Sequence, residues 1–328
     1  MRTSTQIMQG VVVSLMLQAC LAFGAMAGGV SGSFVQLNRE VAGKTVEAWR
    51  NDLSQMRQAG LRTLIVQWSA EEKTSYFNND MPFDEKFDTL ERIFEAIGED
   101  PVDVYLGLEH DPNYWTQITA RERTLRDYFL VRISRDLKLQ QALLKAFGQR
   151  KNWRGYYIPE EIDDKSWRSA HLGRLMGDFL KRLTWQLKKA DPDREVCVSA
   201  FFRGRTAPDV YARNMVEMTR DTGIDHVLVQ DGAGEGDPPL KYVPKYYQAL
   251  QEGWGKGTPD LWCVLEVFQR VDDGKAFKAV PAPATRLQEQ LKYGRLSFTN
   301  LVLFTFFDYA DPDLGKAAEE AFKAFQSP

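Results

Sequence analysis

Short β-rich runs alternate with longer amphipathic segments eight times in this chain, beginning at about residue 31. The β-rich runs are often apolar on both faces, as expected for strands of a parallel sheet that helices cover. We predict strands over 31–36, 62–68, 102–109, 155–161, 195–202, 224–230, 261–268 and 298–307, and helices over 46–59, 84–97, 125–147, 169–189, 208–222, 241–252, 284–293 and 313–325. Eight strand-then-helix units fit an α/β fold of one (β/α)8 TIM barrel better than an open doubly wound sheet.

The first 27 residues have the pattern of a secretory signal peptide. An arginine precedes an uncharged run over 7–24, and Ala25-Met26-Ala27 supplies the small residues that signal peptidase requires. We expect cleavage after Ala27, a barrel domain over 28–328 with no membrane span, and a periplasmic or secreted location. One alternative is an uncleaved membrane anchor, since an apolar run of this length can cross a bilayer. Another is a lipoprotein attached through Cys20, although the residues before Cys20 form a poor lipobox.

Composition and missing motifs exclude several functional classes. The chain has 42 Lys and Arg against 45 Asp and Glu, whereas nucleic-acid binders usually carry a basic face and a high isoelectric point. Metal hydrolysis on a barrel usually needs several His and Asp ligands, and of the 3 His only His110 follows a predicted strand. No predicted strand ends in the lysine of a Schiff-base aldolase, and no Gly-x-Ser-x-Gly elbow is present. We therefore expect no metal and no cofactor.

Polar and aromatic residues collect at the C-terminal ends of the predicted strands, where TIM barrels carry their reacting groups. The candidate site residues are Gln36, Gln67, Trp68, Glu109, His110, Tyr157, Glu160, Glu161, Arg203, Gln230, Asp231, Glu266, Phe307, Asp308 and Tyr309. Aromatic side chains near these ends, including Trp115 and Trp167, are suited to stack on the apolar faces of sugar rings. The alternative is that each amide satisfies loop backbone groups and each aromatic is ordinary packing.

Three glutamates are the candidate catalytic residues. Glu266 stands within an otherwise apolar run, and because burial of an unpaired carboxylate is costly, it should have a partner or a catalytic role. Its alternatives are a structural ion pair, for example with Arg203, and a position at the strand tip in solvent. Glu160 and Glu161 lie where the fourth predicted strand enters its loop. Adjacent strand residues face opposite ways, so only one of these two can face the barrel axis.

Two carboxyl groups across a cleft are what glycosidic bond cleavage requires, since one protonates the leaving oxygen and the other attacks the anomeric carbon. The fourth and seventh strands are expected on opposing sides of the barrel mouth. We therefore expect a glycoside hydrolase that cleaves a β-linked polysaccharide or oligosaccharide, for example a bacterial exopolysaccharide, by a retaining mechanism. The alternative is a non-catalytic carbohydrate-binding barrel that acts in polysaccharide export or envelope assembly.

Residues 32–36 (GSFVQ), 64–68 (LIVQW) and 155–163 (GYYIPEEID) carry a family resemblance. They resemble the secreted bacterial TIM-barrel proteins known as domain of unknown function 4434, which are grouped with glycoside hydrolases. Resemblance to the broad clan of barrel glycosidases implies an acid/base after strand four and a nucleophile on strand seven, here Glu161 and Glu266. The clan's usual Asn before the acid/base is Glu160 in this chain. Either the sugar contacts differ, or Glu160 is itself the acid.

Overall fold

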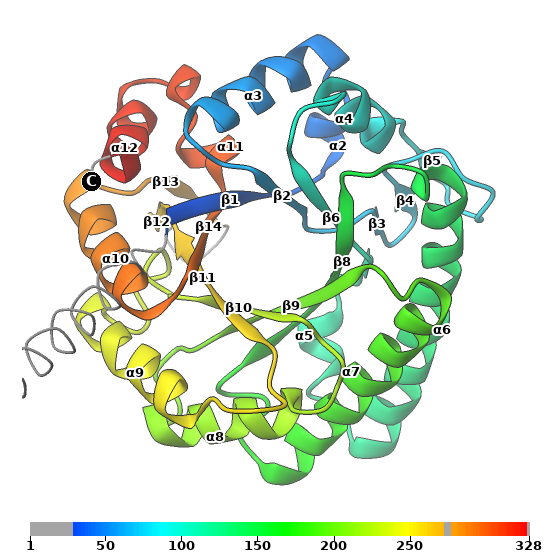
Figure 1. Cartoon of the computed structure of the whole chain (residues 1–328). Coiled ribbons are helices and arrows are strands. Elements are labelled where there is room, and N and C mark those ends of the chain that lie inside the picture. The colour runs from blue at the N-terminus through cyan, green and yellow to red at the C-terminus, as the bar shows by residue number, and fades with distance from the viewer. Residues whose placement is uncertain (1–28, 272–276, 327–328) are drawn as a thin grey trace, which may run out of the picture.

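Eight parallel strands close into a barrel, and a helix follows each strand (Figure 1). The computed structural model describes residues 29–271 and 277–326. In the order in which they pair around the barrel, the strands are β1 (Gly29–Val35), β14 (Asn300–Phe304), β11 (Asp260–Glu266), β10 (His226–Gln230), β9 (Glu195–Phe201), β8 (Trp153–Asp163), β6 (Asp103–Gly107) and β2 (Thr63–Val66). The predicted (β/α)8 barrel is confirmed, and each of its strands overlaps a predicted run.

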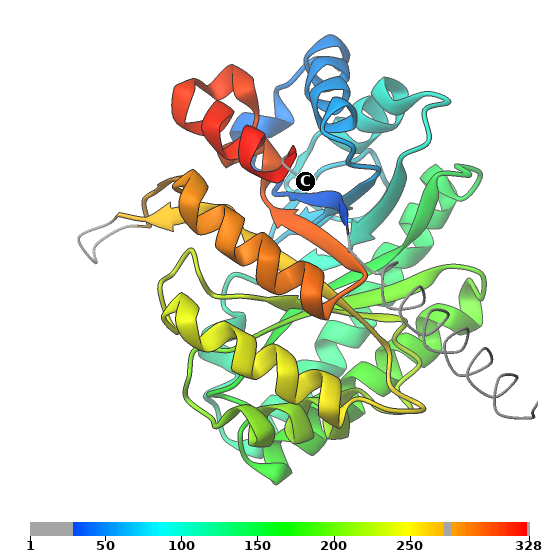
Figure 2. The same ribbon diagram turned by 60° about the vertical axis from the view of Figure 1, so that its left-hand side comes forward.

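The helices form an outer layer around the strands (Figure 2). The helices that follow the barrel strands are α3 (Val46–Gln58), α4 (Thr89–Ile97), α6 (Glu122–Phe147), α7 (Ala170–Ala190), α8 (Pro208–Thr219), α9 (Val243–Gly253), α10 (Ala284–Ser297) and α12 (Lys316–Gln326). Shorter ones are α2 (Arg39–Ala42), α5 (Tyr114–Gln117), α11 (Phe306–Tyr309), η1 (Leu240–Tyr242) and η2 (Pro312–Leu314). Local sequence sets several helix starts. The Thr45 and Ser169 hydroxyls accept the N–H groups of Ala48 and Leu172, which caps α3 and α7.

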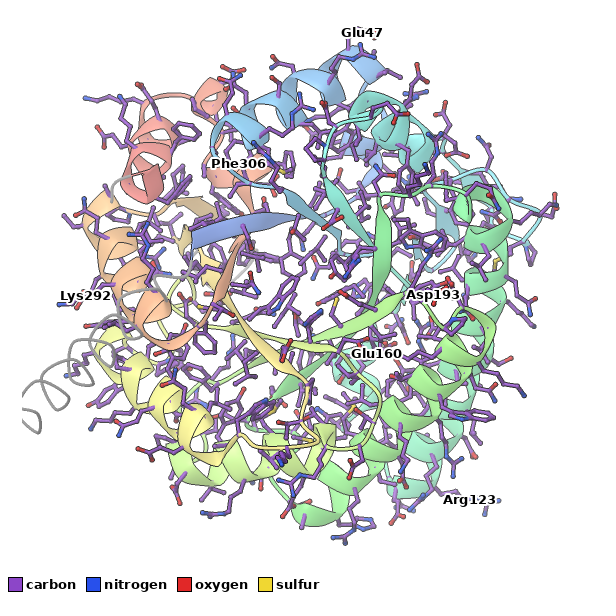
Figure 3. The ribbon with its side chains drawn as sticks, viewed as in Figure 1. Glu47, Arg123, Glu160, Asp193, Lys292 and Phe306 are labelled. Atoms are coloured by element: carbon purple, nitrogen blue, oxygen red, sulfur yellow. The ribbon has the colours of Figure 1, made fainter. Side chains whose placement is uncertain are left out.

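Side chains fill the interior of the barrel (Figure 3). The inward-facing apolar cluster consists of Phe34, Ile65, Tyr105, Tyr157, Cys197, Leu228, Trp262, Val264 and Val302. Because side chains alternate along a strand, residues two or four positions beyond these members also face the barrel axis. The next inward-facing positions toward the barrel mouth are Gln36, Gln67, Glu161, Gln230 and Glu266. The packed interior therefore supports a ring of polar side chains at the C-terminal ends of the strands.

Two small sheets lie outside the barrel, and three predicted boundaries are corrected. One contains β5 (Glu85–Lys86), β4 (Thr74–Ser75), β3 (Ala70–Glu71) and β7 (Glu109–His110), and the other contains β12 (Phe268–Arg270) and β13 (Ala279–Pro281). The run predicted as one strand over 102–109 leaves the barrel after Gly107, because Glu109 and the following residue, His110, pair with β3. The helix predicted over 84–97 begins at Thr89, since its first residues form β5. The strand predicted over 298–307 ends at Phe304, because Thr305 caps helix α11.

The N-terminal predictions lie outside the described residues. These are the signal peptide over 1–27, its cleavage after Ala27 and the alternative lipid attachment at Cys20. Within residues 29–271 and 277–326, no helix is both long enough and apolar enough to cross a membrane.

Candidate active site

A cleft of about 690 Å³ opens at the C-terminal ends of the barrel strands. The predicted site residues that line it are Gln36, Gln67, Glu161, Arg203, Gln230, Glu266 and Tyr309. Amides form one part of its floor, where Gln36 Nε2 donates a hydrogen bond to Gln67 Oε1 at 2.7 Å. The cleft therefore combines two carboxyl groups, three amides and an aromatic ring from the predicted set.

Glu161 reaches the cleft from β8. Its Oε1 atom accepts a hydrogen bond from Gln230 Nε2, at the end of β10, at 2.6 Å. Burial raises the pKa of Glu161 to about 7, against the lowering effect of this hydrogen bond, while the charge of Asp163 raises it further and that of Arg203 lowers it. A carboxyl group that titrates near neutrality can both give and take a proton under physiological conditions.

Glu266 is the last residue of β11 and is 5% exposed. Its Oε2 atom accepts the backbone N–H groups of Gly234 at 2.7 Å and Glu235 at 3.2 Å. A Cβ atom at position 234 would lie 2.9 Å from this oxygen and 2.7 Å from the Phe268 ring, so this close approach requires glycine. Burial raises the pKa of Glu266 to about 8, the charge of Asp231 adds to the rise, and the two N–H groups oppose it.

Asp231 does not line the cleft but supports the loop that binds Glu266. Its Oδ1 atom accepts the N–H of Ala233 at 3.0 Å, and its Oδ2 atom accepts Gln290 Nε2 at 2.6 Å. Arg286, one turn before Gln290 on α10, donates to the backbone carbonyls of Ala233 and Glu266. Two polar side chains of α10 therefore hold the backbone on both sides of the Glu266 carboxyl group.

The alternative ion pair between Glu266 and Arg203 is not formed among the residues that the structure describes. Arg203 Nη2 instead lies 3.2 Å from Glu235 Oε2. Around the barrel, β9 and β10 separate β8 from β11 on one side, and β14, β1, β2 and β6 separate them on the other. Glu161 and Glu266 therefore enter the cleft from opposing parts of the strand ring.

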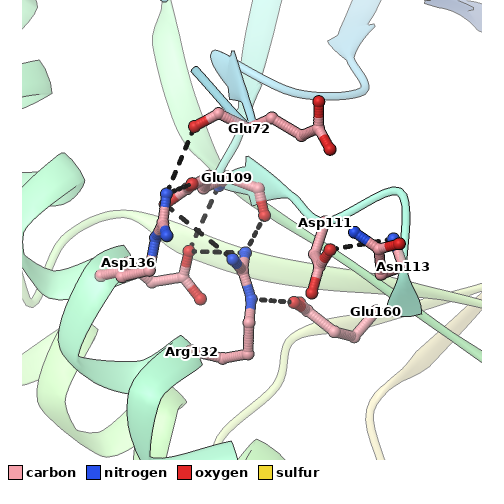
Figure 4. Close-up of polar contacts among 8 residues, drawn as sticks. Glu72, Glu109, Asp111, Asn113, Arg132, Asp136 and Glu160 are labelled. Atoms are coloured by element: carbon pink, nitrogen blue, oxygen red, sulfur yellow. Dashed lines mark hydrogen bonds and ion pairs between the residues drawn. The ribbon is translucent and has the colours of Figure 1, made fainter. Parts of the chain in front are cut away.

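Glu160 points out of the barrel into a buried charged cluster beneath α6 (Figure 4). Arg132 Nε donates to Glu160 Oε1 at 2.8 Å, and the two residues are 3% and 2% exposed. Glu109 lies in the same cluster, where its carboxylate binds Arg135 and its backbone carbonyl accepts Arg132 Nη2. Of the two adjacent glutamates, only Glu161 faces the cleft.

Trp68 and His110 do not line the cleft, and His110 lines a separate pocket together with Glu109. Trp68 Nε1 donates to the backbone carbonyl of Leu37 at 2.7 Å, and its ring stacks on His110 with 4.6 Å between centroids. Burial and the charge of Arg132 lower the pKa of His110 to about 4, so its ring is neutral near neutral pH. Within the described part of the chain, no group of three or more His, Cys, Asp or Glu side chains is arranged to hold a metal ion.

Three further predicted site residues have structural contacts. The Tyr157 hydroxyl, inside the barrel, donates to Ser199 Oγ at 2.9 Å. Phe307 packs edge-on against Trp49 in the core between β14 and α3. Asp308 contacts the hydroxyl of the residue that caps α11. These side chains are absent from the cleft lining because the eighth strand ends earlier than predicted and the Tyr157 ring packs below the mouth.

Sequence reasoning missed much of the aromatic and charged lining. The additional lining residues are Thr119, Asp163, Lys165, Ser166, Phe201, Phe202, Arg205, Gly232, Glu235, Asp237, Phe268, Phe277 and Phe304. Phe201 and Phe304 are inward-facing ends of β9 and β14, so alternation along those strands could have identified them. Phe268 falls in the strand predicted over 261–268, but that strand ends at Glu266 and Phe268 pairs with β13 instead. Phe277 lies between β12 and β13, where no strand was predicted. On the other side, Trp115 of α5 is 40% exposed and lies edge-on to Phe201 at 5.6 Å.

A family model described as domain of unknown function DUF4434 matches residues 30–316. The chain belongs to this family. The uncharacterized protein YbcH of Escherichia coli (strain K12) is similar, with 28% identity over 201 residues. That match covers 61% of this chain and 64% of YbcH, which is less than two thirds of the relative's length.

Solved structures with a similar fold include several glycoside hydrolases. A putative alpha-L-fucosidase from Bacteroides thetaiotaomicron VPI-5482 has a TM-score of 0.72 and 15% identity, with 93% of this chain and 95% of that chain covered. An endo-1,4-beta-mannanase from Rhizomucor miehei has a TM-score of 0.57 and 9% identity over 92% and 96% of the two chains. A beta-galactosidase from Marinomonas ef1 has a TM-score of 0.58 and 10% identity over 90% and 59%. At such low identities the likeness establishes the barrel fold alone.

The two cleft glutamates should reduce the stability of the protein as pH rises. Their pKa values of about 7 and about 8 exceed the ordinary value of 4.5, so above that value the folded state binds more protons than the unfolded state. The free energy of unfolding therefore falls as pH rises from about 4.5 to about 8. We expect Glu161→Gln and Glu266→Gln to melt at least about 3 °C above the wild type near pH 8, and within about 1 °C of it near pH 4.

Calorimetry across this pH range measures the effect. The matched control is Glu95→Gln, which changes an exposed glutamate on α4 and should follow the wild type at every pH. If the difference in melting temperature between each cleft variant and the wild type is the same at every pH, the pKa values of these two carboxyl groups are not raised, and the prediction is wrong.

Proposed function

We propose that this protein is a glycoside hydrolase that cleaves a β-linked polysaccharide or oligosaccharide. The observation that carries the proposal is that Glu161 and Glu266 line one cleft from opposing parts of the strand ring. Glycosidic bond cleavage needs two carboxyl groups in such an arrangement. The glycoside-hydrolase-like fold and the position of the cleft at the C-terminal ends of the strands add support.

In the proposed mechanism, Glu161 is the acid/base and Glu266 is the nucleophile. Glu161 gives its proton to the leaving oxygen as the bond to the anomeric carbon breaks, and a carboxylate oxygen of Glu266 bonds to that carbon. Water, deprotonated by Glu161, then attacks the anomeric carbon and releases Glu266, so configuration is retained. The attacking form of Glu266 is the carboxylate, which the backbone N–H groups on Oε2 stabilise against the opposing effects of burial and the charge of Asp231.

The lining of the cleft is suited to a carbohydrate. The side-chain amides of Gln36, Gln67 and Gln230 offer donors and acceptors to sugar hydroxyls. The aromatic rings of Trp115 and Tyr309 can pack against the apolar faces of sugar rings. The signal peptide predicted over 1–27 would deliver this activity to the periplasm or the exterior of the cell, where envelope and secreted polysaccharides are found.

A substrate screen tests the proposal. The purified protein should release new reducing ends from at least one member of a panel of β-linked polysaccharides and aryl β-glycosides. Chromatography of the products and proton NMR of the first-formed anomer would identify the linkage and the stereochemical outcome. Binding of a polysaccharide without any cleavage between about pH 5 and pH 9 would contradict the proposal and favour a non-catalytic carbohydrate-binding barrel.

A further inference from the structure

The part of β8 that carries Glu161 is not held by regular strand pairing. Along β9 the register passes from the pair Ile158–Val198 to the pair Ile162–Ala200, so four residue steps on β8 span two steps on β9. The ladder between β8 and β6 ends before this irregular stretch begins. Other contacts must therefore set the direction of its side chains.

A buried arginine on α6 supplies those contacts. Arg132 Nε binds Glu160 Oε1 at 2.8 Å, and Arg132 Nη2 donates to the backbone carbonyl of Glu109. Asp136, one turn further along α6, lies 3.5 Å from Arg132 Nη2 and accepts the N–H of Glu109 at 3.2 Å. The cluster in Figure 4 therefore ties α6 to the chain at β7 and to the irregular end of β8.

These contacts bear directly on Glu161. Because Glu160 and Glu161 are neighbours that face opposite sides, a fixed outward position for Glu160 fixes the inward position of Glu161. The Tyr114 hydroxyl reinforces the same backbone by donating to the Glu161 carbonyl at 2.7 Å. On the cleft side, the Glu161 carboxyl group is held by Gln230. The residue is therefore held at its main chain from one side of the barrel wall and at its side chain from the other.

We infer that Arg132 and Glu160 are positioning residues, which hold Glu161 in the orientation that proton transfer to the leaving oxygen requires. This inference rests on the proposed function of Glu161. Neither residue lines the cleft, and neither is needed to touch the substrate. The departure from the Asn that is usual in barrel glycosidases then has a physical reason. Position 160 faces an arginine here, and the amide groups of the cleft come from other strands, including Gln230.

The charged cluster around Arg132 is better suited to fixing the orientation of Glu161 than to stabilising the folded protein. Burial raises the pKa values of Glu160 and Asp136, with Arg132 opposing the rise, so these carboxyl groups are costly to ionise. Apolar residues of similar volume often replace buried ion networks with little loss of stability, but they do not fix a direction as hydrogen bonds do. Stability and orientation can therefore be separated by experiment.

The test is a triple variant, Arg132→Met, Asp136→Leu and Glu160→Met, which removes these three charges together, while the Glu109 carboxylate keeps its partner Arg135. We expect its melting temperature to stay within about 5 °C of the wild type. On a substrate with a poor leaving group, kcat/KM should fall about 100-fold, because proton donation is impaired. On a dinitrophenyl glycoside of the same sugar, whose leaving group needs no proton, kcat/KM should change less than about threefold.

Two more variants complete the experiment. Arg154→Met removes an arginine from the opposite end of β8, where it pairs with Glu195, and should leave both rates unchanged. If the triple variant fails to fold, Arg132→Lys replaces it. Lysine keeps the charge but cannot make both contacts of the guanidinium group, so the same selective loss is expected at about tenfold.

If the triple variant loses kcat/KM equally on both substrates, or on neither, the inference is wrong. The proposed function is judged separately, by whether the wild-type protein cleaves a glycoside. A measurement that needs no activity is the NMR titration of Glu161 in carbon-13 glutamate-labelled protein, assigned with Glu161→Gln. In the triple variant the pKa of Glu161 should move from about 7 toward 4.5 as the side chain loses its buried position. An unchanged pKa would overturn the inference even if the wild type cleaves no glycoside.

Discussion

Glu266→Gln should lower kcat/KM at least about 10⁴-fold on the substrate identified by the screen, because an amide cannot replace a carboxylate as the nucleophile. The substitution preserves shape, and the Gln oxygen can still accept the N–H groups of Gly234 and Glu235. Folding should therefore be retained. Initial rates for the wild type and the variant, with circular dichroism of both, measure the effect.

The covalent step gives an independent readout. A 2-fluoro glycoside with an activated leaving group slows breakdown of the intermediate, so the wild-type protein should gain the mass of one glycosyl group at Glu266. Peptide mapping by mass spectrometry locates the adduct. Glu95→Gln is the matched control and should retain both the rate and the adduct. A Glu266→Gln variant within tenfold of the wild-type rate would exclude Glu266 as the nucleophile.

The barrel could be predicted from the sequence because its signal is repeated eight times and each repeat is locally consistent. Glu266 could be selected for a different reason: a carboxylate within the apolar run 262–268 is costly without a partner. Its partners could not be foreseen, since they are backbone N–H groups of a glycine-rich loop 31 and 32 positions away along the chain. Asp231 in that loop is a predicted site residue, but its contacts are with Ala233 and Gln290, outside the cleft lining.

The choice between Glu160 and Glu161 shows where sequence information ends. The strand before them is apolar on both faces, so alternation alone could not decide which glutamate faces inward. In the structure, Glu160 faces outward and binds Arg132 on the preceding helix. These two residues are 28 positions apart, so no local sequence pattern reveals their contact. Glu109 and His110 were predicted as strand-end site residues. Their pairing with β3 takes them off the barrel, and such two-residue strands have no recognisable sequence period.

Glu161→Gln should produce a loss that depends on the leaving group. Without an acid, kcat/KM on substrates with poor leaving groups should fall about 10²- to 10⁴-fold. On a dinitrophenyl glycoside, kcat/KM should stay within about threefold, because that leaving group departs without a proton. The pKa of about 7 suits both steps of a retaining reaction, since the same group must give a proton first and accept one from water afterwards.

Azide separates the retaining mechanism from the inverting one in the Glu161→Gln variant. In a retaining enzyme, a small anion can attack the covalent intermediate without a base, so azide should accelerate turnover of the dinitrophenyl glycoside and give a glycosyl azide of unchanged anomeric configuration. Proton NMR of the product identifies its anomer. A product of inverted configuration would mean that the carboxyl groups activate water between them.

The two roles are exchanged if Glu266→Gln, and not Glu161→Gln, retains the wild-type kcat/KM on the dinitrophenyl glycoside. Glu266, whose pKa is about 8, would then be the proton donor, and Glu161 would be the nucleophile.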